Sequence, residues 1–139
     1  MTTVTVTEDI AGPAADVWAI LGNFAGVKVG GPVTAVEYEG EGVGMVRTIA
    51  LGGGLVVERL EAHDPDAMRF AYCITNEDCA LPVSDYSASV QVTDLGADGC
   101  RVEWRGTFAP RGAPEADVVT VVEGIYRGGI AGARKAVEG

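Results

Sequence analysis

Arg47 and Glu58 carry opposite charges within residues 42–61, a stretch in which runs rich in valine, isoleucine and threonine flank three glycines at 52–54. Such runs around a glycine pair predict a β-hairpin. With a two-residue glycine loop, Arg47 lies directly opposite Glu58. If this face of the hairpin looks inward, the protein buries an ion pair. Its carboxylate could then transfer a proton, and its guanidinium could stabilise a negatively charged oxygen.

Two alternatives to this interpretation stay open on the sequence alone. A register shifted by one residue sets Arg47 opposite Arg59, which is unfavourable because like charges then face each other, although it collects a more apolar face. The face could also look outward, which would make the contact between Arg47 and Glu58 an ion pair on a solvated surface. A buried pair is costly and often marks a functional site, whereas a solvated pair carries no such implication.

The other residue types that commonly do chemistry are few. His63 is the only histidine and stands in a His-Asp-Pro sequence typical of turns, so we interpret it as a solvated turn residue and not as part of a Ser-His-Asp site. The cysteines Cys73, Cys79 and Cys100 are odd in number and lack metal-ligand spacing, which indicates reduced thiols. We therefore expect no metal site and no cofactor.

Length and composition bound the kind of protein. The 139 residues suffice for a single domain, residues 1–139, and the 47% hydrophobic content is that of a globular chain. A net charge of −10 disfavours binding to nucleic acid or to an anionic membrane, because both need a basic footprint. No apolar run approaches a membrane span, and no signal pattern begins the chain. The sequence predicts a soluble, cytoplasmic protein without membrane insertion, a monomer or a homodimer.

Hydrophobic alternation predicts seven strands, and helical spacing predicts two helices. In chain order these are a strand at 2–8, a helix at 13–22, a strand at 32–39, the two hairpin strands, strands at 68–76, 84–94 and 100–109, and a helix at 116–137. A short helical turn is also expected within 23–31. An antiparallel sheet whose apolar face is covered by the last helix makes an α+β domain.

Alternation along the strands predicts which side chains point inward: Arg47, Glu58, Tyr72, Tyr86 and Trp104. Aromatic walls with a few polar groups are what a small-molecule pocket needs, although core packing alone would also use the three aromatic residues. The strand at 100–109 could instead turn Glu103 and Arg105 inward, and its apolar alternation favours Trp104.

The last helix carries an apolar stripe at helical spacing, formed by Val118, Val122, Ile125, Gly129 and Ala136. It also contains four glycines, at 124, 128, 129 and 132, each of which weakens a helix by roughly 1 kcal/mol relative to alanine. Tertiary packing must then hold the helix. The glycines either allow close helix–sheet contact or thin the helix face beside a ligand cavity.

Five segments together give the chain a family pattern: PAADVWAILGNFAGV, GVGMVRTI, VVERLEAHD, DYSASVQV and VEWRGTFAP. In their order and spacing they resemble the START/Bet v 1-like superfamily, also called SRPBCC, and within it the polyketide cyclase/dehydrase-like and abscisic-acid-receptor-like branches. The resemblance covers nearly the whole chain. It implies a helix-grip fold, in which a seven-stranded antiparallel sheet wraps around a long C-terminal helix and encloses an apolar cavity for hydrophobic ligands, lipids included.

The resemblance also implies cavity positions for particular residues. The glutamate of the ERL motif falls on Glu58 and points into the cavity, the cavity tyrosine falls on Tyr86, and an inward aromatic falls on Tyr72. The receptors' gate loop matches residues 51–54, and their latch loop matches 79–81. The gate and latch sequences depart from those of the receptors, which speaks against hormone reception.

Two function classes follow from these observations. One is an enzyme that cyclises or dehydrates an aromatic or polyketide-like molecule by proton transfer, with Arg47, Glu58 and Tyr86 as its catalytic residues. The other is a non-catalytic carrier or sensor of a hydrophobic ligand. Both predict one set of ligand contacts, namely Tyr72, Trp104, Leu51, Leu81, Val122, Ile125 and Gly129.

Overall fold

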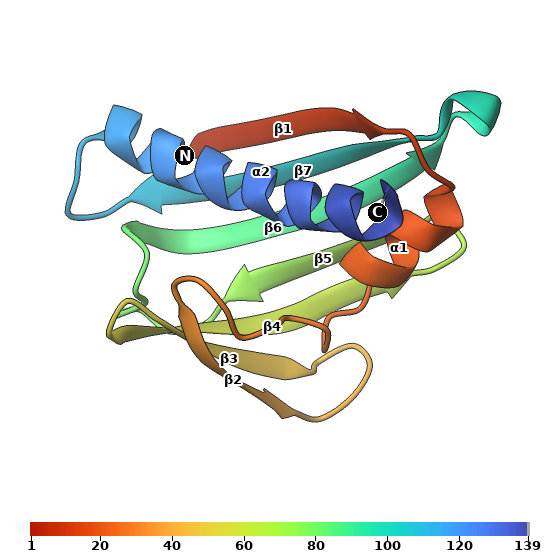
Figure 1. The fold of residues 1–139 in the computed structure, drawn as a ribbon. Helices are drawn as coiled ribbons and strands as arrows, with labels where there is room; N and C mark the ends of the chain where they lie inside the picture. Colours follow the sequence, from red (N-terminus) through yellow and green to blue (C-terminus); the bar gives the residue numbers. More distant parts are fainter. Residues whose placement is uncertain (139) are drawn as a thin grey trace.

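A computed structural model describes residues 1–138 and shows one antiparallel sheet of seven strands with two helices (Figure 1). The elements are β1 (Thr2–Ile10), α1 (Ala14–Leu21), β2 (Val33–Glu39), β3 (Val46–Leu51), β4 (Gly54–Asp64), β5 (Arg69–Ile74), β6 (Val83–Asp94), the 3₁₀ turn η1 (Gly96–Asp98), β7 (Cys100–Pro110) and α2 (Glu115–Glu138). The strand order across the sheet is β1-β7-β6-β5-β4-β3-β2. This arrangement confirms the predicted α+β helix-grip fold.

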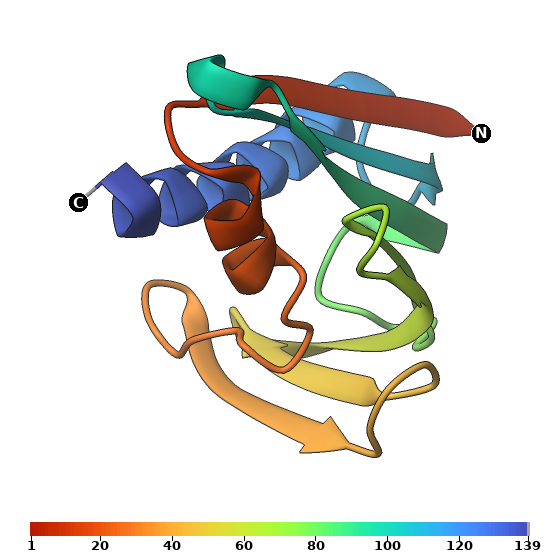
Figure 2. The ribbon, with the colours of Figure 1, turned by 90° about the vertical axis from the view of Figure 1, so that its right-hand side faces the viewer.

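The sheet is strongly curved, and both helices lie inside the curve. Figure 2 shows the sheet turning from β1 at the top to β2 at the bottom, with α1 between α2 and the lower strands. The long helix packs against β1 and β7, and α1 packs against α2, β6 and β7. A layer of helices on one face is what an antiparallel sheet with one apolar face requires.

Alternation in sequence explains the burial of the strands. In β1 the valines Val4 and Val6 are buried, whereas the threonines Thr3, Thr5 and Thr7 between them are exposed. Successive side chains of a strand point to opposite faces, so a Thr-Val repeat gives one solvent-exposed face of threonines and one buried face of valines.

The rotation of α2 differs from the predicted stripe. Its buried residues are Val118, Val122, Tyr126, Ile130 and Ala133. Ile125 is 40% exposed and Ala136 is also exposed, so their placement on the sheet-facing stripe was wrong. Successive side chains of an α-helix point in directions about 100° apart. A modest rotation of α2 about its axis therefore turns Tyr126, and not Ile125, toward the sheet. In this rotation Tyr126 stacks on Trp104 and hydrogen-bonds to Tyr86, while Arg127 and Arg134 form ion pairs with Glu8 of β1.

The glycine turn between β3 and β4 is a tight hairpin. Gly52 and Gly53 have φ angles of 59° and 85°, and a type I′ turn needs positive φ at both central residues. Glycine adopts such angles without the steric cost that other residues meet. The turn sets the register of the hairpin, with Leu51 paired to Gly54 as predicted.

Most predicted element ends lie within a few residues of the observed ones. The fifth strand is shorter than predicted, because Met68 has a φ of 52° in the turn before it. The helical turn expected within 23–31 is a short turn at Phe24–Ala25 followed by an extended loop. Among residues 1–138, no helix combines the length and apolar character that crossing a membrane requires.

Candidate functional site

The hairpin register brings Arg47 and Glu58 together inside the protein. The two residues pair across β3 and β4, and Arg47 Nε lies 2.6 Å from Glu58 Oε1. Their exposed fractions are 8% and 7%. The register with Arg47 opposite Glu58 is therefore confirmed, and the shifted register, with Arg59 opposite Arg47, was wrong. The inward orientation of the pair is confirmed as well.

Aromatic rings and a carbonyl hold the Arg47 guanidinium in place. Its Nη1 donates to the carbonyl oxygen of Phe24 over 3.0 Å, and its Cζ lies 3.9 Å from the centre of the Phe24 ring. The Tyr72 ring centre is 5.5 Å away. Cation–π contacts of this kind strengthen when they are removed from water. Phe24 belongs to the loop after α1, so Arg47 ties this loop to the sheet.

Glu58 retains one free acceptor. Oε1 accepts from Arg47, and no residue among 1–138 donates a hydrogen bond to Oε2. Within the same part of the chain, every fully buried side-chain nitrogen or oxygen has a partner. Oε2 therefore borders space that water can reach, although the residue as a whole is buried. A carboxylate oxygen of this kind can accept a hydrogen bond from a ligand.

Three tyrosines and a tryptophan meet beside this pair, and we call Tyr72, Tyr86 and Tyr126 the tyrosine cluster. The Tyr72 and Tyr86 hydroxyls are 3.1 Å apart, and those of Tyr86 and Tyr126 are 2.5 Å apart. Trp104 Nε1 donates to the Tyr72 hydroxyl over 3.2 Å, and the Trp104 ring stacks on Tyr126 at 5.0 Å between centres. The four side chains come from β5, β6, α2 and β7.

Counting protons shows that one hydroxyl of the tyrosine cluster has a hydrogen left over. The three phenols bring three protons, but only two hydroxyl–hydroxyl bonds join them. The indole of Trp104 can only donate, so its bond to Tyr72 uses none of these protons. Among residues 1–138, the three hydroxyls make no hydrogen bond beyond these. One O–H is therefore available to donate to a ligand oxygen, whichever way the chain of bonds runs.

The tyrosine cluster is held in its neutral form. Burial raises the pKa of Tyr72, Tyr86 and Tyr126 well above the ordinary value of a phenol. The negative charge of Glu58 adds to this effect for the pKa of Tyr72. The cluster and the ion pair therefore share one electrostatic environment, in which the tyrosines act as hydrogen-bond donors near a carboxylate.

Two glycines make room for these aromatic side chains. A Cβ on Gly106 of β7 would overlap the Tyr126 hydroxyl, and a Cβ on Gly129 of α2 would lie 2.6 Å from Trp104 Cζ3. By contrast, a Cβ on Gly128 of α2 would meet no atom within 4 Å. Gly129 therefore serves close helix–sheet contact, which was one of the two interpretations of the helix glycines.

The remaining predicted ligand contacts lie on α2 and near the ends of β3 and β6. Val122 is buried on the sheet-facing side of α2, Leu81 packs at the edge of the core, and Leu51 is half-buried at the hairpin turn. Ile125 lies on the flank of α2 opposite to the arginines that bind β1. The functional roles of these residues, and of Arg47, Glu58, Tyr72, Tyr86, Trp104 and Gly129, stay predictions.

Sequence reasoning missed Tyr126 and Phe24. Tyr126 directly follows Ile125, and a stripe of Val118, Val122, Tyr126 and Ile130 has equally good helical spacing. Phe24 stands in a loop without periodicity, so no signal in the sequence marked it. Trp18 and His63 were not assigned to the site, and they stack on each other away from it, 5.4 Å between centres.

The loops compared with the receptor gate and latch are tied to each other. Ala80 N donates to the carbonyl of Leu55, and the Arg111 guanidinium donates to the carbonyls of Glu77, Cys79 and Leu81 at 2.6, 2.6 and 2.9 Å. Arg111 thus fixes the loop between β5 and β6 in the conformation described. Movement of these loops on ligand binding stays a prediction.

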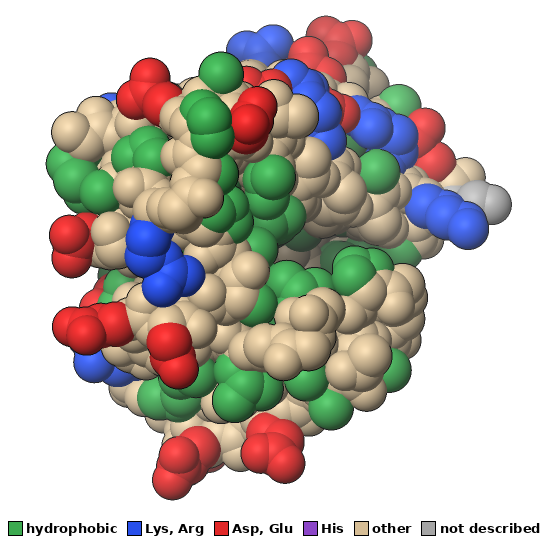
Figure 3. All heavy atoms as spheres, turned by 90° about the vertical axis from the view of Figure 1, so that its left-hand side faces the viewer, with side chains coloured by type: hydrophobic (Ala, Val, Ile, Leu, Met, Phe, Trp, Pro, Cys, Tyr) green, Lys and Arg blue, Asp and Glu red, His purple; other side chains and the backbone are tan. Residues whose placement is uncertain are grey.

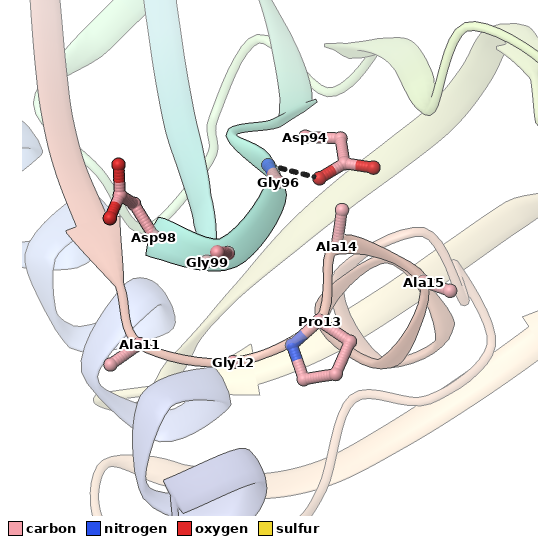
Figure 4. A pocket seen from close by; sticks show the side chains of 10 residues that line it. Ala11, Gly12, Pro13, Ala14, Ala15, Asp94, Gly96, Asp98 and Gly99 are labelled. Atoms are coloured by element: carbon pink, nitrogen blue, oxygen red, sulfur yellow. Dashed lines mark hydrogen bonds between the residues drawn. The ribbon is translucent and has the colours of Figure 1, made fainter.

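A hollow opens on the side of the molecule where these loops lie. Figure 3 shows it near the centre of this face, bordered by hydrophobic side chains. A surface depression of about 530 Å³ lies at the opposite end between Ala11–Ala15 and Asp94–Gly99 (Figure 4). Its lining of small residues and two aspartates includes none of the predicted site residues. We therefore place the candidate site at the ion pair and the tyrosine cluster.

The structure offers little for a metal ion. Among the described residues, no three histidine, cysteine, aspartate or glutamate side chains gather closely enough to hold one. The chemistry available at the site is that of a carboxylate, a guanidinium and neutral phenols.

Comparison with known proteins places the chain in a family and matches its fold. Residues 1–138 match the family described as polyketide cyclase/dehydrase and lipid transport. Among solved structures, the protein XoxI from Bacillus cereus is 26% identical, with a TM-score of 0.85 over 99% of this chain and 96% of that one. An uncharacterised protein from Bacillus thuringiensis is 27% identical, with a TM-score of 0.83 over 97% and 98%.

A plant enzyme shares the fold at lower identity. Norcoclaurine synthase from Thalictrum flavum, solved with dopamine and hydroxybenzaldehyde, is 17% identical, with a TM-score of 0.71 over 96% of this chain and 83% of the enzyme. No curated protein matches the chain by sequence.

Proposed function

The chain belongs to the polyketide cyclase/dehydrase and lipid transport family, and we propose that it binds an aromatic small molecule with polar oxygen groups between the sheet and α2. The helix-grip fold of this family is a hydrophobic ligand-binding fold. The proposal adds the chemical class of the ligand and the residues that meet it.

The observation that carries the proposal is the pair of free hydrogen-bonding groups in an aromatic interior. Glu58 Oε2 can accept a hydrogen bond, and one O–H of the tyrosine cluster can donate one. The protein itself leaves this hydrogen-bonding capacity unused, and a ligand with both a donor and an acceptor would fill it. A phenol that also carries a ketone has both groups on a flat apolar frame.

The surroundings suit the aromatic part of such a ligand. Phe24, Phe70 and Tyr72 form a chain of ring contacts with centres 5.9 to 6.4 Å apart, beside Trp104 and Tyr126. Aromatic walls with a few polar groups are typical of small-molecule sites. The fold relative norcoclaurine synthase, whose structure contains two aromatic molecules, supports the same ligand class by analogy.

A second candidate function, proton transfer on the bound molecule, is favoured by the arrangement of Arg47 and Glu58. Glu58 Oε2 would take the proton of a carbon acid or a phenol. The Arg47 guanidinium, 2.6 Å from Oε1, would hold the carboxylate in place before the transfer and would stabilise the negative charge left on the ligand afterwards. The free tyrosine O–H would stabilise the oxygen on which negative charge develops. This arrangement suits cyclisation or dehydration of a polyketide-like chain, with Tyr86 linking the hydroxyls.

Binding is tested with 6-acetyl-2-naphthol, a rigid aromatic molecule with a hydroxyl and a ketone at opposite ends. Titration calorimetry should detect binding to the wild type. Glu58→Gln should weaken it about tenfold, because it removes the negative charge of the acceptor. Tyr126→Phe should weaken it less, because the two remaining linked phenols still leave one O–H free. Glu103→Gln and Tyr38→Phe, which alter exposed residues of the same types, should leave the affinity unchanged.

The outcomes separate the two functions. Equal affinity for naphthalene and 6-acetyl-2-naphthol would contradict the role of the polar groups, and no binding of either would contradict the ligand class. Native mass spectrometry of the purified protein then identifies any ligand that copurifies. Turnover of that ligand by the wild type but not by Glu58→Gln would establish the enzyme, whereas binding without turnover would establish the carrier.

A further inference from the structure

Two of the eight arginines have no protein partner in the part of the chain that the structure describes. Five form ion pairs with carboxylates, namely Arg47, Arg59, Arg101, Arg127 and Arg134. Arg111 donates to three backbone carbonyls. Within residues 1–138, Arg69 and Arg105 make no ion pair and no side-chain hydrogen bond. Because the chain has twice as many acidic as basic residues, two unpaired guanidiniums need an explanation.

These two arginines line the same depression, on the face of the sheet away from the helices. The depression has a volume of about 310 Å³, and both arginines border it. Arg105 of β7 pairs with Ser89 of β6, which in turn pairs with Ala71 of β5, two residues from Arg69. Small residues therefore lie between the two long side chains, which leaves the space that forms the depression.

Hydroxyl groups line the same depression. Ser87, Ser89 and Thr107 border it, and within residues 1–138 their hydroxyls make no hydrogen bond. Ser87 pairs with Thr107 across β6 and β7, beside the pairing of Ser89 with Arg105. Two guanidiniums and three hydroxyls thus present donors to one small space, and donors of this number and charge suit a phosphate group.

The acidic residues nearby oppose this charge only in part. Glu61 also borders the depression, but its carboxylate accepts from Arg59 over 2.9 Å and from the Cys73 thiol over 2.8 Å. The hydrogen bond from Arg59 is the main reason why the pKa of Glu61 is lowered. Glu103 lies two residues before Arg105 and forms no ion pair with either free arginine. The local balance of Arg59, Arg69 and Arg105 against Glu61 and Glu103 is one positive charge.

We propose that the outer face of the sheet binds a phosphate group between Arg69 and Arg105, with the hydroxyls of Ser87, Ser89 and Thr107 completing its contacts. This site lies on the opposite face of the sheet from the proposed aromatic ligand site and does not depend on it. The phosphate belongs either to a free phosphorylated molecule or to a lipid headgroup.

The first test is a titration of the ¹⁵N-labelled protein with inorganic phosphate at constant ionic strength, followed by NMR. The amides of Ser87, Ser89 and Thr107 should shift and saturate. Arg69→Gln and Arg105→Gln should each weaken binding about fivefold, the effect expected for one exposed charge-assisted contact. Arg101→Gln is the matched control, because Arg101 lies on the same face of β7 and is paired with Asp9.

The result that overturns the proposal is an equal effect of all three substitutions, or shifts spread over the surface without saturation. A second test separates the two sources of the phosphate. Vesicles of phosphatidylcholine with a tenth of phosphatidic acid should bind the wild type but not Arg69→Gln if the partner is a lipid headgroup. Binding of inorganic phosphate without vesicle binding assigns the site to a free phosphorylated molecule.

Discussion

The two halves of the sheet differ in what they bury. The closed half, β1, β7 and β6 under α2, buries only apolar or aromatic side chains on its inner face, and Val90, Val102 and Phe108 have no exposed surface. The open half, β2, β3 and β4, buries Arg47 and Glu58 and is covered by the loop that carries Phe24. The tyrosine cluster joins β6 and α2 of the closed half to β5, the strand between the halves.

One half of the sheet therefore contributes mainly to the stability of the fold, and the other carries the polar groups of the candidate site. Apolar packing supplies most of the free energy of folding, and it needs close contact with a helix. A ligand site needs polar groups with spare hydrogen-bonding capacity, which close packing would fill. Substitutions in the two halves, and a change of pH, test this comparison.

The largest effect is expected from Phe108→Ala in the closed half. Removing a fully buried phenylalanine costs about 4 kcal/mol, since the rigid surroundings leave a cavity. Phe24→Ala in the open half should cost about 2 kcal/mol, because the loop that carries Phe24 can settle and water can fill the space. Urea unfolding of both variants measures the difference, and equal costs would contradict the division into two halves.

Glu58→Ala should lower the free energy of unfolding by about 3 kcal/mol, because it leaves the Arg47 charge buried without its partner. The double variant Arg47→Leu with Glu58→Leu should be more stable than Glu58→Ala, since it leaves no unpaired charge. A double-mutant cycle that adds the single variants Arg47→Leu and Glu58→Leu, measured by urea unfolding, gives the coupling. Should Glu58→Ala unfold at the wild-type urea concentration, the pair would be solvated and the site as described here would not exist.

The tyrosine cluster predicts a loss of stability at high pH. Below about pH 10 the phenols are neutral in both states; above it those of the unfolded chain ionise. The raised pKa values keep the folded ones protonated, so the free energy of unfolding falls by about 1 kcal/mol per tyrosine at pH 11. Absorbance at 295 nm should show three of the four tyrosines ionising only on unfolding. Phenolate formation in the folded protein near pH 10 would contradict this.

The helix glycines 128 and 129 form a matched pair. Gly129→Ala should destabilise the protein by about 1–2 kcal/mol, because its Cβ would displace Trp104. Gly128→Ala should stabilise it by about 0.5–1 kcal/mol, because the position is open and alanine favours helix. Thermal unfolding ranks the two variants, and Trp104 should report the first by near-ultraviolet circular dichroism. Equal stabilities would mean that α2 does not hold Trp104 closely.

Arg111→Gln gives the smallest expected effect, about 1 kcal/mol, because it removes hydrogen bonds that water can partly replace. Hydrogen exchange should nevertheless become faster at residues 77–82 and at the hairpin turn to which Ala80 bonds. Arg127→Gln, on the outer side of α2, is the control and should leave this exchange unchanged. Unchanged exchange in Arg111→Gln would show that other contacts hold the loop.

Much of the fold could be predicted because strand signals are local. The Thr-Val repeat of β1 predicts a strand because its side chains alternate between two faces. The glycines at 52–53 predict a tight turn because glycine tolerates the positive φ angles that the turn needs. The pairing of Arg47 with Glu58 followed from that turn and from charge repulsion in the other register. These arguments need only neighbouring residues.

The sequence alone therefore predicted the order of the strands along the chain and favoured the observed register of the central hairpin, and the structure excluded the shifted register. Tertiary structure decided that the pair of Arg47 and Glu58 points inward, because the loop at Phe24 covers it and Arg47 donates to the Phe24 carbonyl. That loop has no periodic pattern, so its position could not be predicted from the sequence. Tertiary structure also decided that α2 turns Tyr126, not Ile125, toward the sheet, because Tyr126 packs on Trp104 and bonds to Tyr86, which stand on distant strands. Contacts between residues distant in sequence leave no local pattern, and they create the tyrosine cluster.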